Sequence, residues 1–410
     1  MGLSLACAAA QHGYRVTGYD IDHRRLEQLE RGVPAVAGVL PETFHSAHAT
    51  GNLTFSSEPA AIEQADIIVV CVPTPVRDHS PDLTFVEDAC RTVAQHLPPG
   101  SLVVLESTTY PGTTEQVVAS LLETSGLSVG WDFLLAYSPE RIDPGNTEYD
   151  FRSIPRIVGG MSPEATGVAA LFYEQLVDKV EAVSSCRAAE FAKLLENTFR
   201  HVNIALVNEM AMFCHEIDID VWEVIGAAAS KPFGFMPFFP GPGVGGHCIP
   251  LDPTYLAWQI RRDSGHMFRI LEQAQDINAQ MPSWVASRIG DALNEHGKAV
   301  KGATILVLGV TYKPDVADIR ESPPLKVIAA LNRRGAHVEY HDPYVEEITV
   351  NGTHFSSVDL THRSIARADC VALLTPHRTF DLEWISERAM LLFDARNAMQ
   401  DGRLENVVRL

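Results

Sequence analysis

The run Ala65-Asp66-Ile67-Ile68-Val69-Val70-Cys71-Val72 decides the fold class of this chain. An apolar run of this length is expected of a strand that is buried on both faces of a parallel sheet. The run Ser101-Leu102-Val103-Val104-Leu105-Glu106 repeats the pattern after a Pro-Pro-Gly turn, and helix-like segments lie between such runs. Strands that alternate with helices predict an α/β fold with a doubly wound parallel sheet.

The last third of the chain returns to this alternation, whereas the middle third is helical. Strand-like runs recur at 303–309, 337–342, 370–374 and 390–394. Helical periodicity fills the middle third, at 188–212 and 269–293. We therefore predict two Rossmann-like domains joined by a helical block, with boundaries at 1–182, 183–298 and 299–410. The apolar faces of the long helices fit either a dimer interface or packing within the chain.

The composition is that of an ordinary globular protein. The 410 residues are 46% hydrophobic and 20% charged, and the formal net charge of −20 argues against a nucleic-acid surface. No apolar run is long enough to span a bilayer, and the N-terminus lacks a signal-peptide pattern. The seven dispersed cysteines form no CxxC pair and no zinc-like cluster with histidine, so we expect reduced thiols, a cytoplasmic location and no metal.

The start of the chain carries part of a dinucleotide-binding fingerprint. Gly2 fits the last glycine of G-x-G-x-x-G, and Asp20 ends the strand-like run 15–20, where a ribose-binding acid belongs. The strand and the first two glycines that should precede Gly2 do not appear. We therefore expect the natural start to lie upstream, with a GTG valine codon read as Met1. The chain from Met1 should then bind its cofactor weakly.

A second signal is the segment Pro240-Gly241-Pro242-Gly243-Val244-Gly245-Gly246-His247-Cys248-Ile249-Pro250-Leu251-Asp252-Pro253. Glycines let backbone amides approach a ligand closely, and a cysteine placed there can attack a carbonyl carbon. The competing interpretation is a tight surface turn that happens to contain a cysteine.

Several motifs occur together with this loop. They are Glu106-Ser107-Thr108-Thr109-Tyr110-Pro111-Gly112-Thr113-Thr114, Tyr137-Ser138-Pro139-Glu140-Arg141, Lys193-Leu194-Leu195-Glu196-Asn197 and Tyr312-Lys313-Pro314-Asp315. Over essentially its whole length the chain resembles the UDP-glucose/UDP-N-acetylhexosamine 6-dehydrogenase family. The segments 230–237, Asp276-Ile277-Asn278 and Met281-Pro282 look most like the UDP-N-acetylglucosamine branch.

The resemblance implies a four-electron oxidation of a sugar C6 alcohol to a carboxylate, with two NAD⁺. Cys248 would form a thiohemiacetal and then a thioester. Lys193 and Asn197, one helical turn apart, would stabilise charge on oxygen, and Asp252 would accept a proton through water. The plain alternatives are a solvated helix lysine and a surface acid.

Two further catalytic residues come from the same resemblance. Glu140 would position water for hydrolysis as a general base, and Thr108 would hold that water or the substrate oxygen. The plain alternative for Glu140 is again a surface acid.

The resemblance also implies ligand contacts. Those to NAD are Gly2, Asp20, Arg25, Thr74, Thr108 and Arg320. Asp20 favours NAD over NADP because a carboxylate repels a 2′-phosphate, although Arg25 would attract one. Arg320 would meet a phosphate, unless it is an ordinary surface ion pair.

The substrate contacts that the resemblance implies are Lys193, Asn197, Phe239, Gly245 and Lys313. The second α/β half lacks G-x-G-x-x-G and would bind the UDP moiety. Some relatives reach an arginine in from a neighbouring subunit, but Pro232 stands at the matching position here.

Several alternatives stay open at this point. The sugar nucleotide is UDP-N-acetylglucosamine, UDP-N-acetylmannosamine, UDP-glucose or a dTDP sugar, and the product would feed polysaccharide synthesis. A binding protein that has lost catalysis, or a two-electron 3-hydroxyacid-type dehydrogenase, would share much of the fold. A homodimer or a higher homo-oligomer is expected.

Overall fold

The computed structural model describes residues 2–34, 39–77, 80–142, 149–246, 248–399 and 404–410. The chain divides into two compact units, and each is described by itself. Unit 1 comprises Met1–Glu196 and Thr254–Arg262, and unit 2 comprises Asn197–Pro253 and Asp263–Leu410. Helix α7 (Cys186–Glu216) contributes to both units. The predicted division into three domains differs from these two compact units and stays a prediction.

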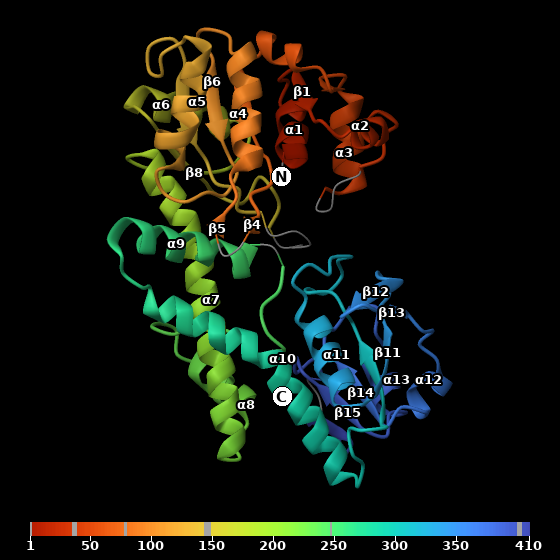
Figure 1. Ribbon diagram of the computed structural model, residues 1–410. Coiled ribbons are helices and arrows are strands. Elements are labelled where there is room, and N and C mark those ends of the chain that lie inside the picture. The colour runs from red at the N-terminus through yellow and green to blue at the C-terminus, as the bar shows by residue number, and fades with distance from the viewer. Residues whose placement is uncertain (1, 35–38, 78–79, 143–148, 247, 400–403) are drawn as a thin grey trace. The chain divides into compact units, whose positions relative to one another are not determined.

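A five-stranded sheet lies at the centre of unit 1 (Figure 1). Its strands, in spatial order, are β3 (Ile67–Val70), β6 (Leu102–Leu105), β7 (Leu134–Tyr137), β8 (Arg156–Gly160) and β9 (Val180–Ala182). Neighbours are parallel except β7 and β8, which pair antiparallel. A separate parallel pair, β1 (Val16–Tyr19) and β2 (Leu53–Ser56), is not hydrogen-bonded to this sheet within the described residues. The first described element is α1 (Gly2–Gln11).

The apolar runs form strands because both faces of this sheet are covered. Along β6, Val103 and Leu105 pack with α4 (Thr84–His96) and α5 (Ala119–Leu122). On the opposite face, Leu102 and Val104 pack with α1 (Gly2–Gln11) and α6 (Pro163–Glu174). Successive side chains of a strand point to opposite faces, so every position of β6 must be apolar.

The remaining elements of unit 1 are short. They are α2 (His23–Glu30), α3 (Pro41–Ala49), β4 (Val76–Arg77), β5 (Ser80–Pro81), the 3₁₀ turns η1 (Pro59–Gln64) and η3 (Glu123–Ser125), and the π-helical turn η2 (Thr114–Val118). Asp22 begins α2, because its carboxylate accepts hydrogen bonds from the backbone N–H groups of Arg24 and Arg25.

Unit 2 contains an all-parallel sheet, as predicted for the last third of the chain. In spatial order its strands are β11 (His337–His341), β10 (Thr304–Leu308), β14 (Cys370–Leu373), β15 (Leu392–Asp394) and β16 (Val407–Arg409). Helices α10 (Arg269–Glu295) and α11 (Pro323–Arg333) cover one face, and α12 (His362–Ala366) and α13 (Leu382–Ser386) the other. A hairpin joins β12 (Glu347–Val350) to β13 (Thr353–Ser356).

The helical middle third also agrees with the prediction. It contains α7, α8 (Val221–Ala229), α9 (Cys248–Ser264) and α10. Four large apolar side chains of α7 within unit 2 are 42–53% exposed: Phe199, Leu206, Met210 and Phe213. A dimer interface on this helix stays a prediction. Every helix in the described part of the chain is too short or too polar to cross a bilayer.

Candidate active site

Asp20 stands directly after β1, where the ribose-binding acid was expected. Its Oδ2 accepts a hydrogen bond from Arg25 Nη1 at 2.7 Å, and its Oδ1 accepts one from the backbone N–H of Asp22 at 2.9 Å. Gly2 begins α1, and a Cβ built on it would lie 3.5 Å from Cys71 Cβ, so the helix start packs closely on the end of β3. An acid after β1 and a glycine at a closely packed helix start fit a bound dinucleotide.

The loops that follow β3 and β6 are joined to each other. The Ser107 hydroxyl donates to the carbonyl oxygen of Val72 and accepts from its N–H, both at 2.9 Å. Thr74 is 7% exposed, and its carbonyl accepts a hydrogen bond from the Tyr255 hydroxyl at 2.8 Å. Thr108, which is half-buried, directly follows Ser107. Thr74 and Thr108 therefore belong to linked loops at the carboxyl edge of the sheet, where ligands bind in α/β folds.

Glu140 follows β7 and is 5% exposed, which excludes the surface-acid interpretation. Its Oε1 accepts from the backbone N–H groups of Arg141 and Ile142, at 2.7 and 2.8 Å, and its Oε2 accepts from Arg156 Nη2 at 2.9 Å. Three donors on a carboxylate with about four lone-pair positions leave roughly one acceptor position free. Glu140 is thus held in one orientation with room for one more donor, such as a water molecule.

Arg156, which the sequence analysis did not single out, is the buried partner of two acids. It is 2% exposed and also contacts Glu106 Oε1 at 3.3 Å. Burial raises the pKa of Glu106, while Arg156 and a hydrogen bond from the Tyr173 hydroxyl lower it. Separating Glu140 from Arg156 would leave a buried charge without compensation, which is strongly unfavourable. Arg156 therefore holds the Glu140 carboxylate in place.

Lys193 lies in α7 and is 8% exposed, which excludes the solvated-lysine interpretation. Its side chain makes no hydrogen bond or ion pair with any residue that the structure describes. An ammonium group at the end of a largely buried side chain gains from an anionic partner. Such a lysine is prepared to receive an anionic oxygen from a ligand.

Asn197 and Asp252 contact each other in unit 2. Asn197 Nδ2 donates to Asp252 Oδ2 at 2.5 Å, and the two residues are 8% and 4% exposed. Asp252 stands one turn into α9, which begins at Cys248. The side chain of Cys248 and all of His247 lie outside the described residues. The predicted carboxylate and amide therefore meet, whereas the role of the thiol stays a prediction.

The glycine-rich segment before α9 is packed, so it is not a simple surface turn. A Cβ on Gly245 would lie 2.7 Å from Pro323 Cδ, and one on Gly246 would lie 2.8 Å from Tyr312 Cε2. The Gly246 N–H also donates to the carbonyl oxygen of Arg320 at 3.0 Å. No larger residue fits at these two positions without moving its neighbours, which explains the glycines.

Two buried asparagines support the same segment: Asn208, which the sequence did not point to, and Asn278, which it pointed to only as part of a motif. Asn208 Oδ1 accepts from the Gly241 N–H at 3.0 Å, and its Nδ2 donates to Asn278 Oδ1 at 2.9 Å. Asn278 Nδ2 donates in turn to the carbonyl oxygen of His201 at 3.2 Å. Burial lowers the pKa of His201 to about 4, so the ring is neutral at pH 7. The sequence signal that could have identified them is an asparagine on the apolar face of a long helix, because a buried amide needs hydrogen-bond partners.

The loop that contains Lys313 is held by a buried histidine. His377 Nε2 lies 3.0 Å from Asp342 Oδ2, and its Nδ1 accepts from the Asp315 N–H at 2.9 Å. Asp315 also pairs with Arg378 at 2.6 Å. Lys313 itself is half-buried. These contacts fix the backbone just after the predicted substrate lysine.

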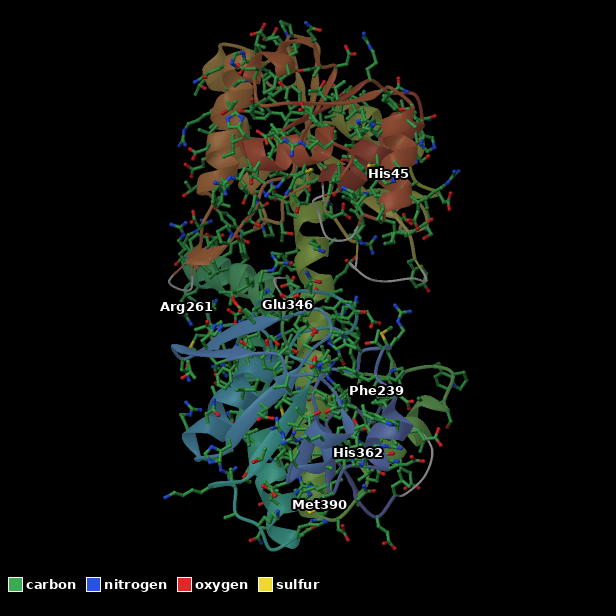
Figure 2. The ribbon with its side chains drawn as sticks, turned by 90° about the vertical axis from the view of Figure 1, so that its right-hand side faces the viewer. His45, Phe239, Arg261, Glu346, His362 and Met390 are labelled. Atoms are coloured by element: carbon green, nitrogen blue, oxygen red, sulfur yellow. The ribbon has the colours of Figure 1, made fainter. Side chains whose placement is uncertain are left out.

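Two predicted contact residues are exposed. Arg320 pairs with Asp318 through two nitrogens, at 3.0 and 2.6 Å, so a phosphate would have to replace that ion pair. Phe239, labelled in Figure 2, is 57% exposed and stacks on Trp222 with ring centroids 6.1 Å apart. Their ligand roles stay predictions. Within the described residues, no group of three His, Cys, Asp or Glu side chains is placed to hold a metal.

Comparisons with known proteins agree over the whole chain. Models of the UDP-glucose/GDP-mannose dehydrogenase family match at residues 1–177 (NAD binding domain), 187–280 (central domain) and 306–401 (UDP binding domain). UDP-N-acetyl-D-mannosamine dehydrogenase of Pyrococcus horikoshii is 34% identical, over 98% of this chain and 94% of that protein. UDP-N-acetyl-D-glucosamine 6-dehydrogenase of Salmonella typhi is 33% identical, over 93% and 88%.

A solved structure is equally similar. The UDP-D-ManNAc dehydrogenase of Pyrococcus horikoshii aligns with a TM-score of 0.90 at 32% identity, covering 100% of this chain and 96% of that one. The names of these relatives divide between two sugars, so similarity alone does not select one.

Proposed function

Since the chain belongs to the UDP-glucose/GDP-mannose dehydrogenase family, we propose that it oxidises the C6 hydroxyl of a UDP-sugar to a carboxylate. The family makes it an NAD-dependent nucleotide-sugar dehydrogenase. UDP-N-acetylglucosamine is the proposed substrate. The support for this sugar is the amino-acid sequence of segment 230–237, which resembles the UDP-N-acetylglucosamine branch of the family.

The observation that carries the proposal is Lys193. Lys193 as a residue is 8% exposed and its side chain has no partner within the described residues, so its ammonium group is available to a ligand oxygen. An oxygen that gains negative charge during reaction is a better acceptor than a neutral hydroxyl. Binding that strengthens as charge develops lowers the barrier, which is what a catalytic cation must do.

The first oxidation uses three groups of this chain. NAD⁺, when bound, takes up one hydride from C6 in each of the two oxidations. Asp252, oriented by Asn197, accepts the C6 hydroxyl proton through water. Lys193 and Asn197 stabilise the oxygen as it loses that proton. The product of this step is an aldehyde.

The second oxidation needs a covalent bond to the enzyme. The Cys248 thiolate adds to the aldehyde carbon, and the carbonyl oxygen takes up a proton to give a thiohemiacetal. Loss of a second hydride and of that proton gives a thioester. Water, positioned by Glu140 and Thr108, then attacks the carbonyl carbon, the C–S bond breaks, and the carboxylate and the free thiol form. Two hydrides leave C6 for each molecule of water consumed.

The experiment that tests the function measures NADH release against a panel of UDP-N-acetylglucosamine, UDP-N-acetylmannosamine, UDP-glucose and dTDP-glucose. We expect two NADH per sugar and the highest kcat/KM with UDP-N-acetylglucosamine. One NADH per sugar would contradict the four-electron reaction. Tight sugar-nucleotide binding without any NADH would instead identify a binding protein that has lost catalysis.

Replacing Asp20 is expected to change the preferred dinucleotide. In Asp20→Ala, the ribose hydroxyls lose an acceptor, and Arg25 keeps only its longer contact with Asp22, at 3.8 Å, so it can turn to a 2′-phosphate. We expect kcat/KM with NAD⁺ to fall about tenfold or more, and use of NADP⁺ to rise by a similar factor, as hydrogen bonds to charged groups predict. Glu27→Gln, which replaces an exposed acid of α2, should change neither value. An unchanged NAD⁺/NADP⁺ ratio would exclude Asp20 from the ribose site.

A further inference from the structure

Glu190 is a buried acid that the proposed reaction does not use. It lies in α7 three residues before Lys193 and is 0% exposed. No arginine, lysine or histidine pairs with it in the part of the chain that the structure describes. Burial raises the pKa of Glu190 to about 7, although hydrogen bonds from Thr114 and Gly112 lower it. A buried carboxyl group without a cation needs an explanation beyond packing.

The partners of Glu190 all belong to the loop that follows Thr108. Its Oε1 accepts from the Thr114 N–H at 2.9 Å and from Thr114 Oγ1 at 2.7 Å. Its Oε2 accepts from the Gly112 N–H at 2.5 Å, and Thr109 Oγ1 lies 3.4 Å from Oε1. Gly112 has a φ of 96°. Glycine adopts this left-handed conformation readily because it has no Cβ, whereas other residues rarely do.

The backbone after this loop has an uncommon geometry. Thr114 begins the π-helical turn η2, and π-helical turns occur frequently at functional sites. The first N–H groups of a helical turn have no hydrogen-bond acceptor within that turn. Here Glu190 Oε1 is the acceptor for the Thr114 N–H. A second contact from α7 to the same segment joins Arg187 to Glu115 at 2.6 Å. Helix α7 thus holds the loop through two side chains, three and six residues before Lys193.

We propose that Glu190 positions the 106–114 loop, and with it Thr108, relative to Lys193. This inference rests on the proposed function, because it assigns Glu190 to the placement of two groups of that reaction. Glu190 and Lys193 are three residues apart on α7, so their side chains are neighbours on the helix surface. The same helix therefore holds both the loop and the lysine. Glu190 is a positioning residue, since its oxygens are occupied by the loop.

The test compares Glu190→Gln with the wild-type enzyme. Glutamine retains one oxygen for Thr114 but directs an NH₂ group toward the Gly112 N–H. By hydrogen–deuterium exchange, the amides of 108–116 should exchange about tenfold to hundredfold faster, as loss of hydrogen bonds to a charged group predicts. With UDP-N-acetylglucosamine, kcat should fall about tenfold or more while KM changes less than about threefold, because the change concerns only the transition state.

The stability of the variant separates positioning from a structural role. A group with a raised folded-state pKa contributes stability below its unfolded pKa of 4.5, and this stability is lost as pH rises through about 7. At pH 8 the wild type therefore carries the cost of a buried charge, and Glu190→Gln should melt within a few degrees of it. Glu174→Gln, an exposed acid in α6, is the control and should change neither exchange nor kcat.

Three outcomes would overturn the proposal. The first is unchanged exchange at 108–116, and the second is faster exchange with an unchanged kcat. The third is a rise in KM by the same factor as the fall in kcat. If Glu190→Gln does not fold, Thr114→Val removes only the hydroxyl contact and should give a smaller effect of the same kind. If the wild type oxidises no sugar in the panel, the proposed function fails by itself, and the exchange rates still decide whether Glu190 holds the loop.

Discussion

Replacing Cys248 by serine is expected to abolish formation of the sugar acid. Serine is a far weaker nucleophile than a thiolate, and without the thiohemiacetal the aldehyde cannot be oxidised through a thioester. Removal of the covalent nucleophile lowers kcat by about 10⁶ in a serine protease, so we expect a loss of at least about 10³-fold here. The measurement is acid product by chromatography, together with NADH per sugar, which should not exceed one.

Another cysteine of the same unit provides the matched control. Cys214 lies in α7, is 8% exposed and packs with Val207 and Val221. Cys214→Ser should lower thermal stability slightly and leave the ratio of two NADH per sugar unchanged. If Cys248→Ser still made acid at the wild-type rate, the four-electron mechanism would be excluded and a two-electron dehydrogenase would become the better interpretation.

The fold was predictable because its central strands are buried on both faces. The runs 65–72 and 101–106 contain β3 and β6, and their apolar character follows directly from two covering layers. The antiparallel strand β8 was not predicted. Whether a strand runs parallel or antiparallel depends on which distant strand it pairs with, here β7 through Tyr137 and Gly159, and short local patterns do not carry that information.

The candidate site was predictable only where motifs surround its residues. Lys193, Asn197 and Asp252 were selected from motif context, and the structure buries all three. Arg156 and Glu190 were not selected, because each acts through partners far away in sequence. Arg156 reaches Glu106 over 50 residues, and Glu190 reaches Gly112 over 78. Single charged residues in a strand or helix carry no local signal of such contacts.

Replacing Lys193 by methionine is expected to lower kcat strongly while leaving the protein as stable as before. Methionine has a similar length but no charge, so the oxygen at C6 would lose the cation that stabilises its negative charge. Loss of one such group costs about 10² to 10³ in kcat in other enzymes. Methionine places an apolar side chain of similar length at this largely buried position, so the melting temperature should stay equal or rise. Steady-state kinetics and thermal unfolding measure the two effects.

Opposite changes in activity and stability are the signature that separates a catalytic lysine from a structural one. If Lys193 only supported packing, methionine would leave kcat nearly unchanged, and the interpretation of this residue as the oxygen-binding cation would be wrong. Lys179→Met is the control, because Lys179 is 64% exposed beside Glu181 and should alter neither quantity. A lysine whose side chain is largely buried, with no partner in the described part of the chain, is retained for what it binds.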